Sequence, residues 1–120
     1  MESMFARYGG FTKVSRIVSS FYDRVLDSPI MSPYFGATDM KRLIDHQTKF
    51  IAFLMGGPAS YSDEQLRRVH EHMAIDRPAF EEMVTLMTET FEDFDFADED
   101  VRAIRAELER RAPMIVTRVS

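Results

Sequence analysis

The chain of 120 residues contains no cysteine and no tryptophan. Without cysteine there are no disulfide bonds, no thiolate metal ligands and no covalent cofactor attachment through a C-x-x-C-H motif. No apolar run approaches the roughly 18 residues that a membrane-spanning helix needs. The start, "MESMFARYGGFTK", lacks the charged-then-apolar order of a signal peptide. We therefore expect a cytoplasmic protein with no membrane partner.

The overall composition predicts one folded domain, residues 1–120. Hydrophobic residues make up 45% of the chain, which excludes a disordered protein and at this length supplies a real core. The net charge of −5 argues against nucleic acid as the main partner. Ten Phe and nine Met suit an irregular apolar cavity, because Met adapts its shape and contacts aromatic rings favourably. An ordinary helical core explains the same composition.

Apolar residues recur with the period of an α-helix along nearly the whole chain. The predicted helices cover residues 14–25, 39–55, 66–73, 78–91 and 101–119. Pro113 should bend the last of these, and "EDFDFADED" before it reads as an acidic loop. No segment alternates with period two for long enough to form a strand. The sequence therefore predicts an all-α domain.

The three histidines are the first candidates for chemistry. His70 lies on the apolar face of its helix beside Leu66, whereas His72 points roughly the opposite way and should be solvated. His46 lies on the shoulder of the apolar stripe of residues 39–55, and Gln47 lies in the middle of that stripe. A histidine on an apolar face is more often a hydrogen-bonded core residue than a ligand. Two helices that each bring one to an apolar surface nevertheless favour a metal between them.

Most other kinds of site lack their residues. A structural zinc site would need carboxylates beside the histidines, and no H-E-x-x-H spacing is present. "YGGF" follows no strand, so it is a turn rather than a phosphate-binding loop, and no serine lies in a nucleophile elbow. The cofactor that accepts one or two neutral imidazoles in an apolar slot is haem iron.

Two further polar residues lie on apolar stripes. The Tyr22 hydroxyl and the Gln47 amide, on different helices, would form a polar cluster that donates hydrogen bonds to a diatomic ligand. The alternative is that the tip of Tyr22 simply reaches solvent.

Five stretches of the chain together carry a family resemblance. They are "RYGGFTKVSRIVSSFYDRVLDSP", "PYFGATDM", "HQTKFIAFLMGGPASY", "LRRVHEHM" and "RRAPMIVTRVS". In order and spacing they resemble the truncated (2/2) haemoglobins of group I. The resemblance covers almost the whole chain and implies a two-on-two helical sandwich that binds one haem b.

The resemblance also implies roles for individual residues. His70 resembles the proximal histidine that binds the iron, and Tyr22 and Gln47 resemble the distal pair that stabilises bound oxygen. Leu43 occupies the position where ordinary globins carry their distal histidine. The residues expected to line the haem are Phe35, Leu43, Phe50, Leu54, Leu66, Val69, Ile75, Phe80, Val84 and Ile115. The candidates for binding the haem propionates are Arg42, Lys49 and Tyr61.

Three further expectations follow from the family. Some members bind haem covalently through a histidine in the last helix, but Thr117 stands at that position, so we expect haem held without a covalent link. An apolar tunnel to the distal side would be lined by Val14, Val18, Ile51 and Met87. In several members a histidine at the position of His46 binds the iron when no outside ligand is present, which implies a hexacoordinate His46–Fe–His70 resting state.

The function implied is binding of O2, NO, CO and cyanide by a monomer. One interpretation is an enzyme that converts nitric oxide to nitrate with an external reductase. Another is a protein that stores, carries or senses its ligand without turnover. A third, from a different class, is a haem-free helical interaction module, which the absence of a Soret band would identify.

Overall fold

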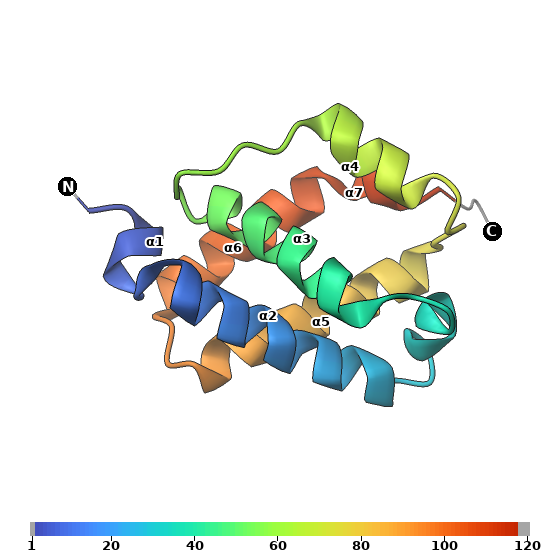
Figure 1. The fold of residues 1–120 in the computed structure, drawn as a ribbon, viewed down its shortest axis with the longest axis horizontal. Coiled ribbons are helices and arrows are strands. Elements are labelled where there is room, and N and C mark those ends of the chain that lie inside the picture. The colour runs from blue at the N-terminus through green and yellow to red at the C-terminus, as the bar shows by residue number, and fades with distance from the viewer. Residues whose placement is uncertain (1, 118–120) are drawn as a thin grey trace.

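The computed structural model describes residues 2–117. Its elements are α1 (Met4–Arg7), α2 (Gly10–Asp27), the 3-10 helix η1 (Ser32–Phe35), α3 (Met40–Leu54), α4 (Asp63–His70), α5 (Arg77–Asp93), α6 (Asp98–Arg110) and α7 (Ala112–Ile115). Within residues 2–117 every regular element is a helix (Figure 1). None of the helices in this part of the chain combines the length and apolar content needed to cross a bilayer.

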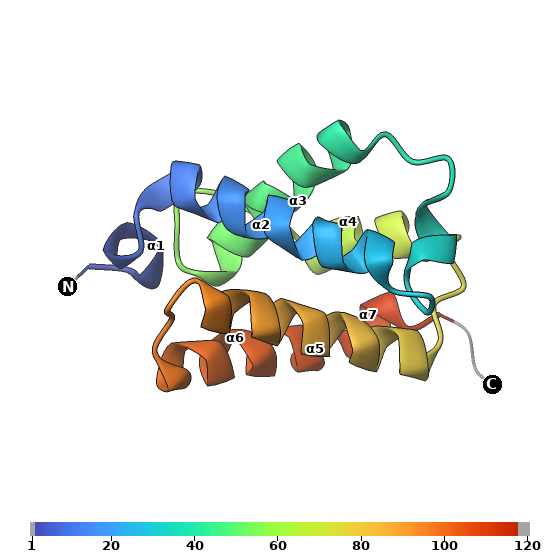
Figure 2. The ribbon, with the colours of Figure 1, turned by 90° about the horizontal axis from the view of Figure 1, so that it is seen from below.

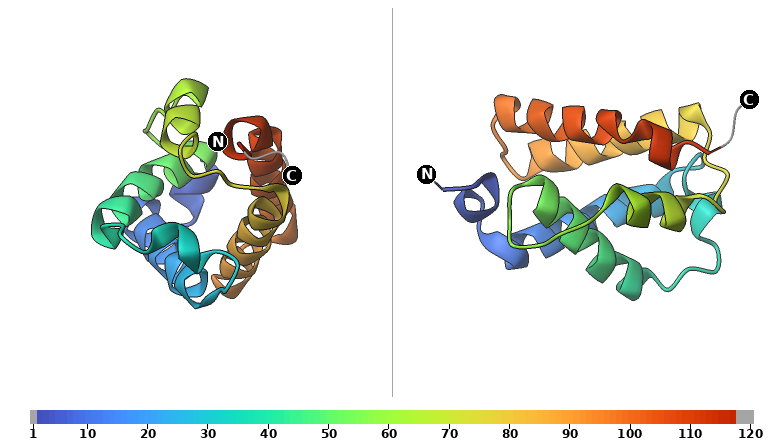
Figure 3. Two further views of the ribbon diagram at one scale, coloured as in Figure 1. Left: turned by 90° about the vertical axis from the view of Figure 1, so that its right-hand side faces the viewer. Right: turned by 90° about the horizontal axis from the view of Figure 1, so that it is seen from above.

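Two pairs of helices form the body of the molecule. Helices α2 and α3 pack together in one layer, α5 and α6 form the other, and α2 also contacts α5 across the layers. Figure 2 shows α5 and α6 beneath α2 and α3, which is the two-on-two sandwich that the sequence predicts. The short helix α4 contacts α7 and lies along the side of the sandwich (Figure 3).

The long helices form where apolar residues recur at helical spacing. All six residues of the predicted stripe on α2 are buried, from Val14 to Val25. Side chains also mark where helices begin. Asp39 accepts a hydrogen bond from the Arg42 amide at 3.2 Å, and Asp76 accepts one from the Ala79 amide at 3.0 Å. Such N-caps satisfy amide groups that have no partner inside the helix.

The chain between residues 91 and 117 departs from its prediction. Residues 101–119 are not one helix, because α6 ends at Arg110 and α7 restarts at Ala112 with Pro113 in its first turn. There a proline sacrifices no internal hydrogen bond. The acidic loop is also shorter than predicted, since α6 begins at Asp98. Acidic residues in a first turn interact favourably with the helix dipole. Val119 lies outside the described residues.

The predicted helix at 66–73 is displaced toward the N-terminus. Its start is fixed by a capping box, in which Ser62 Oγ accepts from the Gln65 amide and Gln65 Oε1 accepts from the Ser62 amide. The helix then ends at His70, and the following turn contains Ala74 in the left-handed region with φ 52°. His70 is therefore the last residue of its helix rather than a central one.

The N-terminal residues tie the two layers together at one end. The Phe5 amide donates to the Met55 carbonyl at 2.9 Å, at the end of α3. The Tyr8 hydroxyl donates to Asp100 Oδ2 at 2.6 Å, and the Arg7 guanidinium pairs with the same carboxylate at 3.2 Å. These hydrogen bonds hold the pKa of Asp100 below its usual value. We call Phe5, Arg7 and Tyr8 the N-terminal clasp.

The clasp depends on the absence of a side chain at Gly57. A Cβ atom there would lie 2.6 Å from Phe5 Cδ1 and 3.0 Å from the Ala52 carbonyl oxygen. We therefore expect Gly57→Ala to lower the free energy of unfolding by about 1–3 kcal/mol, as overpacked substitutions do. Urea unfolding followed by circular dichroism measures the change.

Gly36→Ala is the matched control. No heavy atom lies within 4 Å of a Cβ built at Gly36, and its φ of −57° suits alanine. It should leave stability unchanged or raise it by about 0.4–1 kcal/mol. Equal effects of the two substitutions would show that the contact with Phe5 is unimportant.

Candidate functional site

An apolar cavity of about 260 Å³ lies between the two helix layers, with α4 on one side. Most of the residues that the sequence proposes for a binding pocket line it. They are Tyr22, Phe35, Leu43, Gln47, Phe50, Leu66, Val69, His70, Ile75, Phe80 and Ile115. Val69 also has 42% of its surface exposed, so the cavity reaches the protein surface beside His70. Residues from α2 to α7, from η1 and from the connections between them thus meet around one space.

A hydrogen bond to the backbone determines which ring nitrogen of His70 carries the proton. Its Nδ1 lies 2.7 Å from the Leu66 carbonyl oxygen. Because a carbonyl can only accept, Nδ1 carries the proton and Nε2 keeps its lone pair. Burial lowers the pKa of His70, which favours the neutral ring, although the bond to the Leu66 carbonyl acts in the opposite direction. The cavity therefore contains one imidazole nitrogen that is ready to bind a metal.

Tyr22 is the most deeply buried polar group of the cavity wall, with 7% of its surface exposed. Its ring packs edge-on against Phe21 at 4.9 Å and against Phe35 at 5.8 Å, both between ring centroids. Burial first, and the nearby Tyr61 second, raise the pKa of Tyr22 above its usual value. Within residues 2–117 no buried side-chain oxygen or nitrogen lacks a hydrogen-bond partner, and no other side chain pairs with the Tyr22 hydroxyl, so this hydroxyl keeps accessible surface in the cavity. It is therefore free to donate to a ligand in the cavity.

Gln47 is half-buried on α3 and also lines the cavity. Tyr22 and Gln47 therefore contribute polar groups to the same space from two helices. Their neighbour Leu43 lines the cavity with an apolar side chain. The strongly polar side chains of the lining are those of Tyr22, Gln47 and His70, and Thr38 adds a hydroxyl.

His46 lies outside this cavity. It is exposed on α3, and its ring lies against Tyr61 with the ring centroids 6.5 Å apart. His72 is exposed as expected, with its Nε2 3.3 Å from Glu71 Oε1. Of the three histidines, only His70 lines the cavity.

Five other proposed haem contacts lie away from the cavity wall. Leu54 is half-buried at the end of α3, and Val84 is buried in the core from α5. Arg42 and Lys49 are exposed on α3, and Tyr61 is half-buried in the connection to α4. Of the proposed tunnel residues, Ile51 and Met87 line the cavity, whereas Val14 and Val18 belong to the closed core with no exposed surface.

Sequence reasoning also missed part of the lining. The sequence did not predict a place in the cavity for the following lining residues: Phe21, Val25, Met31, Thr38, Met73, Ala79, Met83 and Leu108. Several of them stand on helical stripes, which identify a buried face but not the neighbour that it meets. Met31 and Thr38 lie in a connection, where no period applies. Four methionines line the cavity, as the composition suggests.

The donor set fits haem better than a bare metal ion. Within residues 2–117, no group of three or more His, Asp or Glu side chains is close enough to hold a metal. A single imidazole suffices for haem, because the porphyrin supplies four nitrogen ligands itself. The unpartnered Tyr22 hydroxyl and the apolar wall complete a site of this kind. The residues present therefore fit a haem bound through His70.

Comparison with known proteins agrees with this geometry. The model of the family described as "Bacterial-like globin" matches residues 3–116. The group 1 truncated hemoglobin LI410 of Chlamydomonas moewusii is 35% identical over 59% of this chain and 42% of its own length. The group 1 truncated hemoglobin GlbN of Mycolicibacterium paratuberculosis is 36% identical over 61% of this chain and 54% of its own length. The matched region thus spans about half the length of these relatives.

A solved structure extends the likeness to nearly the whole fold. The 2/2 hemoglobin of a Synechococcus species, in the cyanomet state with covalently attached heme, superposes with a TM-score of 0.88. It is 20% identical in sequence, and the match covers 98% of this chain and 100% of that one. At this identity the likeness concerns the fold.

The buried state of Tyr22 predicts a change in stability at high pH. Because folding raises the pKa of Tyr22 above its unfolded value of about 10, the unfolded chain ionises first as the pH rises. The free energy of unfolding should therefore fall above about pH 10. Tyr22→Phe should make this fall shallower, as measured by urea unfolding at several pH values. Tyr34→Phe is the control and should retain it. Equal slopes in both variants would contradict the burial of the Tyr22 hydroxyl.

Proposed function

The chain belongs to the bacterial-like globin family, and from this premise we propose that it binds oxygen and other diatomic ligands at a haem b held by His70. Family membership and the truncated haemoglobin relatives support haem-based binding of diatomic ligands in general. The observation that carries the finer proposal is the pairing in one apolar cavity of the His70 ring with the unpartnered Tyr22 hydroxyl. A haem-free interaction module gives no reason for either group to be buried there.

In this proposal the wall of the cavity holds the haem without a covalent bond. His70 Nε2 would hold the iron, and Phe35, Phe50 and Phe80 contribute aromatic surface to the wall. The Synechococcus protein is described with covalently attached heme. Here Thr117 offers no imidazole to a porphyrin, which supports non-covalent binding. Arg42, Lys49 and Tyr61 remain our candidates for the propionates at the edge of the site.

The distal residues give the site its preference among ligands. When bound, haem iron supplies electron density to a diatomic ligand, so that oxygen acquires partial negative charge. Hydrogen bonds to such an acceptor are stronger than those to a neutral one. The Tyr22 hydroxyl and the Gln47 amide are donors in the cavity wall, whereas Leu43 in the same wall cannot donate. They should therefore favour oxygen over carbon monoxide.

We propose that in the resting protein His46 would be a second histidine ligand of the haem iron. Gln47 lines the cavity, and His46 lies one residue earlier, about 100° around the helix. A modest rotation or local unwinding of α3 would carry its ring inward, and the apolar Leu43 leaves this space free of a competing ligand. An outside ligand would then displace His46, coupling ligand binding to movement of α3.

Two biological uses fit this site. Conversion of nitric oxide to nitrate combines one NO with one O2 and one electron, and the electron must come from a reductase on another chain. Storage, transport or sensing of the ligand needs no electron. The polar distal pair favours the first use, because it slows loss of oxygen before nitric oxide arrives. We also propose a monomer and a cytoplasmic location.

His70 provides the direct test of haem binding. His70→Ala should abolish stable haem binding or leave a loosely held haem, because no other side chain in the cavity offers a neutral imidazole. Absorption spectra of the purified protein with added hemin, followed by transfer of haem to apomyoglobin, measure this. His72→Ala should behave like the unaltered protein. An unchanged ferrous spectrum and normal haem retention in His70→Ala would reject the assignment.

The distal pair is tested by ligand release. Tyr22→Phe or Gln47→Leu should speed oxygen release by about 2-fold to 150-fold, the range that corresponds to roughly 0.5–3 kcal/mol per hydrogen bond. Release of carbon monoxide should change less, since it carries less negative charge. Stopped-flow ligand replacement measures both rates. If Tyr22→Phe leaves the oxygen rate unaltered, Tyr22 does not donate to the ligand.

The role of His46 is tested by the ferric spectrum at neutral pH. We expect the low-spin spectrum of haem with two histidines, and His46→Leu should convert it to a high-spin spectrum. The reason is that no other described side chain near α3 supplies a neutral imidazole. A high-spin spectrum in the unaltered protein that His46→Leu does not change would contradict this assignment and leave that of His70 intact.

A further inference from the structure

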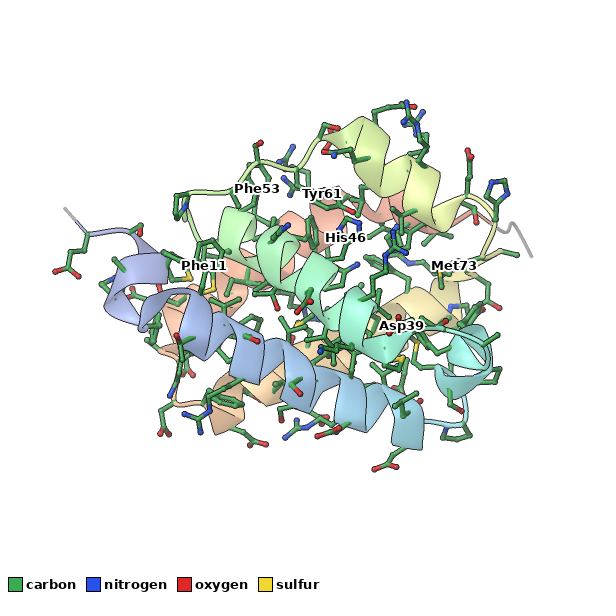
Figure 4. The ribbon with its side chains drawn as sticks, in the orientation of Figure 1. Phe11, Asp39, His46, Phe53, Tyr61 and Met73 are labelled. Carbon is green, nitrogen blue, oxygen red and sulfur yellow. The ribbon has the colours of Figure 1, made fainter. Side chains whose placement is uncertain are left out.

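The outward position of His46 has a specific contact behind it. The His46 and Tyr61 rings meet at a centroid distance of 6.5 Å and an interplanar angle of 73°, which is edge-to-face geometry. Figure 4 shows both side chains between α3 and the connection that leads to α4. The ring of His46 is thus held against an aromatic partner outside the cavity.

Tyr61 is itself well anchored toward the cavity. Its ring packs on Phe50 with a centroid distance of 5.0 Å and an interplanar angle of 60°. Phe50 is 4% exposed and lines the cavity. The contacts therefore run from His46 through Tyr61 to the wall of the haem site.

In the chain, Tyr61 lies directly before α4. Tyr61 directly precedes Ser62, whose capping box starts that helix. An apolar residue before the N-cap commonly packs against the fourth helical residue, which here is Leu66. Leu66 also provides the carbonyl that orients His70. Tyr61 therefore lies in the chain just before the helix that carries His70, and its ring contacts the ring of His46.

We propose that Tyr61 is the positioning residue for His46, holding the imidazole outside the cavity and setting the balance between a free and a His46-occupied sixth position. The inference rests on the proposed ligation by His46. To reach the iron, the ring of His46 must leave the face or edge of Tyr61, so the energy of their contact opposes ligation. The hydroxyl of Tyr61 is not needed for this role, because the contact is between rings.

The experiment compares Tyr61→Leu with Tyr61→Phe in the haem-loaded protein. Leucine keeps an apolar side chain against Phe50 but removes the ring, whereas phenylalanine keeps the ring. Tyr61→Leu should shift the ferric high-spin to low-spin ratio about 2-fold to 10-fold toward low spin. Where the low-spin form is already complete, carbon monoxide binding to the ferrous protein should slow by the same factor. Tyr61→Phe removes only the hydroxyl that is our propionate candidate, and because it keeps the ring it should leave this ratio and the carbon monoxide rate unshifted.

A second measurement does not depend on ligation by His46. In the diamagnetic carbon monoxide form His46 is displaced, so nuclear Overhauser effects between its ring protons and those of Tyr61 report the contact directly. They should be present in the unaltered protein. Their absence would overturn the proposal even if Tyr61→Leu failed to fold.

The remaining outcomes separate this inference from the proposed function. A Tyr61→Leu protein with an unaltered spin balance and unaltered kinetics, combined with loss of the low-spin form in His46→Leu, would overturn the role of Tyr61 and leave ligation by His46 standing. Equal shifts in Tyr61→Leu and Tyr61→Phe would also overturn it, since the hydroxyl would then be responsible. High-spin spectra in the unaltered protein and in all three variants would reject ligation by His46 and the role of Tyr61 together.

Discussion

The hydrogen bond between His70 Nδ1 and the Leu66 carbonyl is the interaction on which the site depends. At 2.7 Å it determines which nitrogen of the ring carries the proton and which one keeps its lone pair. It exists because α4 places the two residues four apart, one turn of helix from each other. The capping box at Ser62 fixes the start of that helix, and the helix ends at His70 itself. A short, capped helix thus presents one imidazole in a defined orientation.

The rest of the cavity lining has few polar side chains. An apolar wall lowers the local dielectric constant, so a hydrogen bond from Tyr22 or Gln47 is stronger there than in water. The Tyr22 hydroxyl is informative because it is accessible in this apolar space and pairs with no other side chain there. Chemistry at the site is then a matter of which small molecule completes these bonds. Outside the wall, the contact between the rings of Tyr61 and His46 opposes movement of the His46 ring into the cavity.

The sequence predicts the helical layers well and the cavity only partly. The stripe on α2 is buried residue for residue, because period alone identifies the face of an isolated helix. Leu54 and Val84 belong to such faces but point to other neighbours, since the period does not say which helix lies opposite. Met31 and Thr38 sit in a connection whose path depends on the packing around it. The outward position of His46 depends on Tyr61, fifteen residues later, and no local pattern contains that contact.

The N-terminal clasp joins parts of the chain that lie far apart in sequence. The bonds from Arg7 and Tyr8 to Asp100 span 93 and 92 residues, nearly the whole polypeptide. Closing so large a loop carries an entropic cost that is repaid only once both layers are already in place. The clasp should therefore close late in folding and open early in unfolding. A nascent chain could arrange α2 and α3 and begin to form the cavity before Arg7 and Tyr8 reach Asp100. The clasp then closes on helix layers that have already packed, and it does not direct their packing.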